Sequence, residues 1–239
     1  EGSRGMTAKK INVVDTCHTI TPNFRQVDVF GGYTAAAGSN FIYTNALPKR
    51  FQGMAMVCEP TMKVVSLMDV QPDGAGYKAL DAFNIYASSD EWNSPVHAEV
   101  GPDGAVWVAD FQNFIIQHNP TPSKERGGFV ATTGVGGAHE NDLRDHSRGR
   151  IYRIVAKNAP RYVGGPMPAP KTTSKNWVSA LNQNTQHGRL LVQKVLVEEQ
   201  AFIHSGKEEL VPDLKAAVSA TEGKIGSIHS LWTLHGLGK

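Results

Sequence analysis

The chain has 239 residues, of which 40% are hydrophobic and 19% charged, and this composition is ordinary for a globular protein with a sizeable core. Its 24 lysines and arginines nearly balance its 22 acidic residues, so charge gives no indication of a nucleic-acid or membrane-surface partner. No apolar run is long enough to span a membrane, and residues 1–10 lack the apolar core of a signal peptide.

The first candidate motif along the chain is Cys17-His18, which matches the end of the CxxCH sequence that attaches haem. Position 14 is valine where the first cysteine would stand, so we expect no covalent haem in this segment. Cys17 and Cys58 could form one disulfide or remain two buried thiols, and the compartment therefore stays undecided.

Short apolar runs with many alternating positions characterise the first part of the chain. Six of them are expected to be strands: 41–44, 54–59, 64–70, 82–87, 106–110 and 150–155. The order of an inner strand, a terminal carboxylate and an outer strand occurs twice, which predicts two β-propeller blades of about four strands each. Two blades cannot close a ring, and the chain ends within an apolar helical pattern, so we expect a fragment whose other blades precede it.

The segment Pro95–Asp110 predicts a β-hairpin with Asp103-Gly104 at its turn. Successive side chains of a strand point to opposite faces, so His97 and Glu99 must share a face. A carboxylate beside an imidazole can orient it as a general base, which makes this pair the candidate catalytic residues. The alternative is a hydrogen-bonded histidine that only packs between blades.

The segment 111–149 is too long for an ordinary hairpin connection, and long insertions on a rigid scaffold are often functional. Within it the sequence AHENDLRDH concentrates imidazoles and carboxylates, which are ligands for metal ions. The candidate metal ligands are His139, Glu140, Asp142 and Asp145. The spacing matches no fixed metal motif, so a solvated polar loop is the alternative.

A segment rich in proline and glycine, residues 157–173, predicts a linker between two domains. Residues 174–239 then show apolar positions at helical spacing, with Ser174 as a candidate N-cap, and predict pairs of helices. We therefore expect a mixed two-domain chain. Residues 1–156 would form the C-terminal part of a β-propeller, and residues 174–239 an all-α solenoid segment of HEAT-like repeats.

The sequence SSDEWNSPVHAEVGPDGAVWVADFQNFIIQHNPTP, followed by LRDHSRGRIYRIV, resembles the PVC-type membrane-bound dehydrogenases. The resemblance is strongest over 88–155 and extends less tightly over most of the chain. It implies a glucose/sorbosone dehydrogenase-like propeller, HEAT-like repeats, and a c-type cytochrome domain outside this chain. It also implies a periplasmic or exported location, with membrane association through parts not present here.

The function implied by this resemblance is an oxidoreductase that acts on sugars or polyols and passes electrons to the cytochrome. Its cofactors would be pyrroloquinoline quinone and calcium. The resemblance carries no site residues over to this chain, because the family's catalytic base lies in blades that we expect to precede it. From the residues themselves, His97 and Glu99 are the candidates for catalysis and Asp110 and His118 for cofactor contact. We expect this fragment alone to be inactive. Two other functions stay open: a non-catalytic scaffold that binds polysaccharide or protein partners, partly through the helical repeats, and a metal-dependent lactonase-like hydrolase.

Overall fold

The computed structural model describes residues 18–21, 33, 36–114, 116, 147–159, 165–170, 172–199, 210–220 and 225–239. The chain divides into two compact units. The sheet unit consists of Glu1–Ile42, Gly53–Glu99 and Val106–Ile154, and the helical unit of Tyr43–Gln52, Val100–Ala105 and Val155–Lys239. None of the helices in these described ranges is long and apolar enough to cross a membrane.

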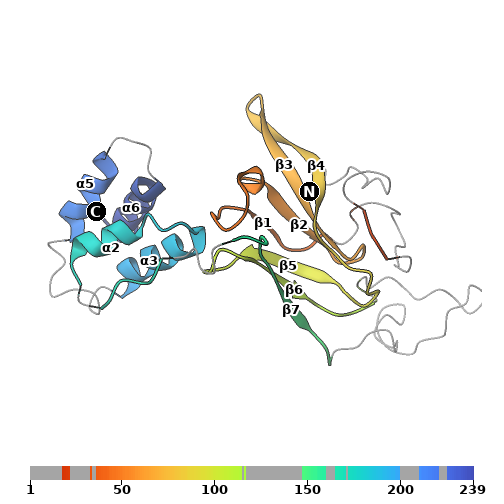
Figure 1. Ribbon diagram of the computed structural model, residues 1–239. Helices are drawn as coiled ribbons and strands as arrows, with labels where there is room; N and C mark the ends of the chain where they lie inside the picture. The colour runs from red at the N-terminus through yellow and green to blue at the C-terminus, as the bar shows by residue number, and fades with distance from the viewer. Residues whose placement is uncertain are drawn as a thin grey trace, which may run out of the picture. The chain divides into compact units, whose positions relative to one another are not determined.

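The first sheet of the sheet unit has four antiparallel strands in the order β1-β2-β3-β4. They are β1 (Ser39–Phe41), β2 (Ala55–Glu59), β3 (Val64–Asp73) and β4 (Gly76–Ala87). β2 is buried along its whole length and pairs with β3 only as far as Met68. Beyond Met68, β3 and β4 pair with each other alone and form a two-stranded ribbon (Figure 1).

The second sheet contains β5 (Pro95–Val100), β6 (Val106–Asp110) and β7 (Arg150–Ile154), in that order. The predicted hairpin is confirmed as β5 and β6, but its turn lies one residue earlier than expected. The Gly104 amide donates to the Gly101 carbonyl at 3.0 Å, which places Pro102 and Asp103 at the centre of the turn. Gly104 follows with a φ of +80°, a conformation that favours glycine.

A short stretch before β1 connects the two sheets by backbone hydrogen bonds. The Ala37 amide donates to the Cys58 carbonyl on β2 at 2.9 Å, and the Cys58 amide donates to Gly38 at 3.1 Å. The Gly38 amide in turn donates to the Val96 carbonyl on β5 at 2.8 Å. Cys58 itself is a buried free thiol, and Cys17 lies outside the described residues.

The helical unit contains α2 (Ser174–Ala180), α3 (Gln186–Glu198), α5 (Leu210–Ser219) and α6 (Ile225–Gly236). Thr173, and not Ser174, caps α2, because its hydroxyl accepts the amide of Asn176. Thr185 caps α3 in the same way by accepting the amide of Gly188 at 3.1 Å. The four helices share one apolar core: Trp177, Val178, Leu181, Val192, Leu196, Leu210, Leu214 and Leu234.

The predicted fold class, a partial β-propeller followed by an all-α HEAT-like solenoid, is wrong. Within the described ranges the chain forms antiparallel sheets of four and three strands together with four α-helices, a mixed α/β arrangement. The helical unit is not all-α, since it includes Tyr43–Gln52 and the hairpin turn at Val100–Ala105. The two strand pairs that suggested a repeat are present as the antiparallel pairs β2–β3 and β6–β7. Such pairs occur in any antiparallel sheet, so they did not identify blades.

Candidate functional site

His97 and Glu99 lie on one face of β5, as the strand alternation predicted. The imidazole Nε2 is 3.4 Å from a carboxylate oxygen of Glu99, and both side chains are 51% exposed. On its other side the imidazole lies against Gly38, where an added Cβ would come within 2.6 Å of Nδ1. The pair is therefore oriented and open to solvent, and its role in catalysis stays a prediction.

Asp110, the predicted cofactor contact at the end of β6, is only 4% exposed. One carboxylate oxygen accepts the backbone amides of Ser94 at 2.7 Å and Gln112 at 2.8 Å, and the other accepts the side-chain amide of Asn93 at 2.9 Å. Both oxygens are thus used to fasten the chain before β5 to the end of β6. This arrangement fits a cofactor poorly, and cofactor binding by Asp110 stays a prediction.

The sheet unit also contains a buried lysine that the sequence interpretation missed. Lys63 lies in the β2–β3 turn with a φ of +64° and no exposed surface. Its ammonium donates to the Ser94 hydroxyl at 3.2 Å and to the Asn113 carbonyl at 3.5 Å, and it lies 5.6 Å from the ring centre of Phe114. A signal was present, since this is a single charge within the apolar run TMKVVSLM.

Burial lowers the pKa of Lys63 from 10.5 to about 8, although nearby carboxylates, Asp110 first among them, act in the opposite direction. A lysine with such a pKa is chemically suited to act as a base. In this protein, however, the ammonium is enclosed and already donates to Ser94 and Asn113. Lys63 and Asp110 therefore form a structural polar centre, which joins the β2–β3 turn to the segments that flank β5 and β6.

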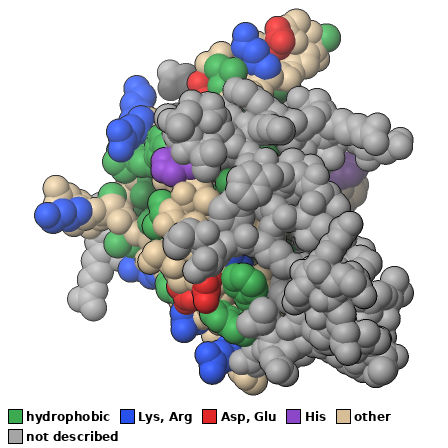
Figure 2. Space-filling view, turned by 90° about the vertical axis from the view of Figure 1, so that its right-hand side faces the viewer, with side chains coloured by type: hydrophobic (Ala, Val, Ile, Leu, Met, Phe, Trp, Pro, Cys, Tyr) green, Lys and Arg blue, Asp and Glu red, His purple; other side chains and the backbone are tan. Residues whose placement is uncertain are grey.

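The remaining predicted site residues lie outside the described part of the chain: His118, His139, Glu140, Asp142 and Asp145. Where the structure does describe residues, it contains no group of three or more His, Cys, Asp or Glu side chains that could hold a metal ion. On the face shown in Figure 2, the described basic and acidic side chains are scattered among hydrophobic ones and gather in no single charged patch.

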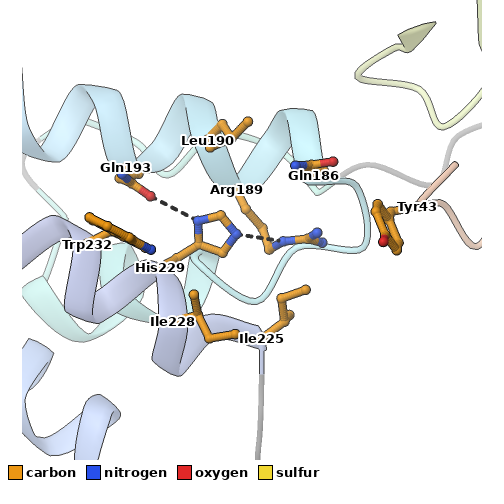
Figure 3. A pocket seen from close by; sticks show the side chains of 9 residues that line it. All are labelled: Tyr43, Gln186, Arg189, Leu190, Gln193, Ile225, Ile228, His229 and Trp232. Atoms are coloured by element: carbon orange, nitrogen blue, oxygen red, sulfur yellow. Dashed lines mark hydrogen bonds between the residues drawn. The ribbon is translucent and has the colours of Figure 1, made fainter. Parts of the chain in front are cut away.

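A pocket of about 430 Å³ lies in the helical unit, mainly between α3 and α6. We call it the α3–α6 pocket (Figure 3). Its lining consists of Tyr43, Gln186, Arg189, Leu190, Gln193, Ile225, Ile228, His229 and Trp232. The size is within the range of small-ligand sites, and the lining combines apolar walls with a few polar groups.

The polar groups of the α3–α6 pocket form a hydrogen-bonded chain across the two helices. Arg189, which is 4% exposed, donates from Nε to Nε2 of His229 at 3.1 Å and from Nη1 to the Gln183 carbonyl at 2.7 Å. Because Nε2 of His229 accepts, its Nδ1 carries the hydrogen and donates to Gln193 at 3.0 Å. Burial and the adjacent guanidinium both lower the pKa of His229, in agreement with a neutral imidazole.

The apolar walls come largely from α6, which presents hydrophobic side chains on more than one face. Leu234 packs into the core of the helical unit, whereas Ile228 and Trp232, which line the pocket, are 57% and 56% exposed. Leu231 is 55% exposed on the same helix but does not line the pocket. Trp232 also makes an edge-on contact with His235, with 5.8 Å between ring centres. A helix that is apolar beyond its core-facing stripe is typical of one with a further binding surface. The run IGSIHSLWTLHG contained this signal in the sequence.

Comparison with known proteins identifies the family but no activity. The family model described as "Domain of unknown function (DUF7133)" matches residues 3–158, so the chain belongs to that family. The match includes the seven strands that the structure describes and ends before α2. Searches of curated proteins and of solved structures gave no match to this chain.

Proposed function

We propose that this chain is a non-catalytic binding module and that its site is the α3–α6 pocket. The observation that carries the proposal is the exposed apolar surface of α6, where Ile225, Ile228 and Trp232 line the pocket at helical spacing. Such surface is costly to leave in water, and covering it would contribute about 25 cal/mol per Å². Like the scaffold alternative from the sequence, this function is binding without turnover, but its ligand is a small molecule with an apolar part and not a polysaccharide or a protein.

The internal order of the pocket supports binding of a defined ligand. Arg189 and Gln193 on α3 are linked through His229 on α6, so the polar floor is held before any ligand arrives (Figure 3). The capped start of α3 at Thr185 further fixes the helix that carries these groups. A preordered site loses less conformational entropy when it binds, and this favours affinity.

The proposal predicts saturable binding of the neutral fluorescent probe N-phenyl-1-naphthylamine to the intact chain. Replacing Trp232 by alanine should weaken this binding about tenfold, because a large apolar wall is lost. Leu231→Ala is the matched control, since Leu231 has similar exposure on the same helix but does not line the pocket. A fluorescence titration that shows no saturation, or an equal loss in both variants, would contradict the proposal.

A second proposed function follows from the sequence resemblance. The chain would be part of a periplasmic or exported oxidoreductase that acts on sugars or polyols, as in the PVC-type membrane-bound dehydrogenases. The contact between His97 and Glu99 favours it, because an oriented, solvent-accessible imidazole can accept a proton from a substrate hydroxyl. Pyrroloquinoline quinone would supply the hydride acceptor. Both carboxylate oxygens of the buried Asp110 are already engaged, so we assign this residue no contact with the cofactor.

The oxidoreductase proposal predicts that the full-length protein, supplied with pyrroloquinoline quinone and calcium, reduces an electron-accepting dye when aldoses are added. His97→Ala should lower the rate about 100-fold or more, which is the usual loss when a general base is removed. His187→Ala, at the start of α3, is the control and should leave the rate unchanged. Absence of dye reduction across a panel of aldoses and polyols would refute this proposal.

A further inference from the structure

We propose that the α3–α6 pocket selects small molecules that carry a carboxylate on an aromatic or branched aliphatic body, with Arg189 as the group that binds the anion. This inference rests on the proposed binding function and adds the chemical class of the ligand. It depends on the charge of Arg189, the neutrality of its protein partners, and the apolar surfaces around it.

The positive charge of Arg189 is not compensated by an acidic side chain in the described parts of the chain. Its hydrogen-bond acceptors are the neutral carbonyl of Gln183 and the neutral imidazole of His229. Burial alone lowers the pKa of this guanidinium, without an opposing contribution from a carboxylate. A buried charge without a counter-ion is unfavourable, and a bound anion would remove that cost.

Arg189 also has donors left for a ligand. A guanidinium has five N–H groups, and two of them serve the carbonyl of Gln183 and the ring of His229. The residue lines the pocket, and Figure 3 shows its guanidinium between Gln186 and Ile225. Guanidinium groups bind carboxylates through paired, charge-assisted hydrogen bonds, so a ligand carboxylate fits this position.

The hydrogen bonds of His229 make the pocket better suited to a ligand that is an anion than to one that is a cation or a hydrogen-bond donor. Its Nε2 already accepts from Arg189, and its Nδ1 donates to Gln193, so the imidazole offers no free acceptor toward the pocket. The nearby side chains of Gln186 and Gln193 are neutral amides. Among the described residues that line the pocket, Arg189 is therefore the only charged one, and it is positive.

The walls determine what the carboxylate must be attached to. Leu190 on α3 and Ile225 and Ile228 on α6 are 45–57% exposed, and Trp232 adds an aromatic face. An inorganic anion would leave these surfaces in water, whereas an aromatic or branched aliphatic body would cover them. This combination points to an organic carboxylate and not to phosphate or sulfate.

The test compares two probes of the same shape, 3-phenylpropionate and 3-phenylpropanamide, by isothermal titration calorimetry with the intact chain. The carboxylate is expected to bind at least tenfold more tightly than the amide. Arg189→Gln should abolish this preference. Equal affinity of the two probes, or no binding of either while the neutral naphthylamine probe still binds, would overturn the carboxylate inference and leave the binding function standing.

Exposed positions supply variants that do not depend on the buried arginine, whose replacement could disturb folding. Ile228→Glu places a negative charge on the pocket wall and should weaken binding of 3-phenylpropionate at least tenfold more than Ile228→Gln does. Leu231→Glu adds the same charge to the same helix outside the pocket and should have little effect. An equal loss in Ile228→Glu and Leu231→Glu would also overturn the inference. Failure of all three probes to bind would instead contradict the binding function itself.

Discussion

Replacement of Asp110 by alanine is expected to lower the free energy of unfolding of the sheet unit by about 3–5 kcal/mol. The substitution removes a carboxylate that is 4% exposed and accepts the amides of Ser94 and Gln112 as well as the side chain of Asn93. These donors would remain buried without their acceptor. The charge of Lys63 would also lose its largest electrostatic compensation.

Urea unfolding followed by circular dichroism measures this effect. Asp110→Asn retains the shape and one oxygen acceptor, so its loss should be smaller, about 1–3 kcal/mol. Asp73→Ala, at the exposed end of β3, should change the free energy of unfolding by no more than about 0.5 kcal/mol. If Asp110→Ala lowers the free energy of unfolding less than Asp110→Asn does, the hydrogen bonds of the carboxylate do not contribute the stability assigned to them.

The second large effect concerns pH and Lys63. In the folded protein the pKa of Lys63 is about 8, whereas in the unfolded chain it returns to 10.5. Above pH 8 the folded state has released this proton and the unfolded state still holds it, so the free energy of unfolding rises with pH. From pH 8 to pH 9 the expected gain from this group is up to about 1.4 kcal/mol.

Denaturant titrations at pH 7.5, 8, 8.5 and 9 measure the gain, and Lys63→Met is the reference. The variant lacks the titrating group and should show a smaller rise over the same interval. The comparison ends at pH 9 because burial, together with Glu59, raises the pKa of Cys58 from 9.0 to about 12. As the pH rises, the thiol of Cys58 ionises in the unfolded chain before it does so in the folded protein, and this lowers the free energy of unfolding above pH 9. If the free energy of unfolding changes with pH equally in the wild-type protein and in Lys63→Met, Lys63 is not the source of the gain.

Local sequence patterns predicted the elements well where the decisive interactions are local. The β5–β6 hairpin follows from alternation on either side of a turn with glycine, and α3 follows from apolar residues at helical spacing. The face shared by His97 and Glu99 needs only the two-residue period of a strand. These features depend on neighbours in sequence, so one sequence was sufficient.

Long-range contacts account for what the sequence did not reveal. Asp110 was recognised as a carboxylate at a strand end, but its engagement by Ser94, 16 residues away, required the fold. Arg189 and His229 meet across 40 residues, so no local motif marked the floor of the pocket. The repeated strand pairs were wrongly interpreted as propeller blades. Local alternation predicts that strands exist, but it does not determine how many of them assemble into one sheet.

The backbone bridge at Gly38 has a further consequence for association between molecules. Among the strands that the structure describes, β5 lies at an edge of its sheet, and edge strands present unpaired backbone groups that promote aggregation. The Gly38 amide occupies the Val96 carbonyl, so this point of the edge is closed from within the same chain. A side chain at position 38 would collide with His97 and with the Val96 carbonyl itself, so only glycine allows the chain to close its own edge at this point.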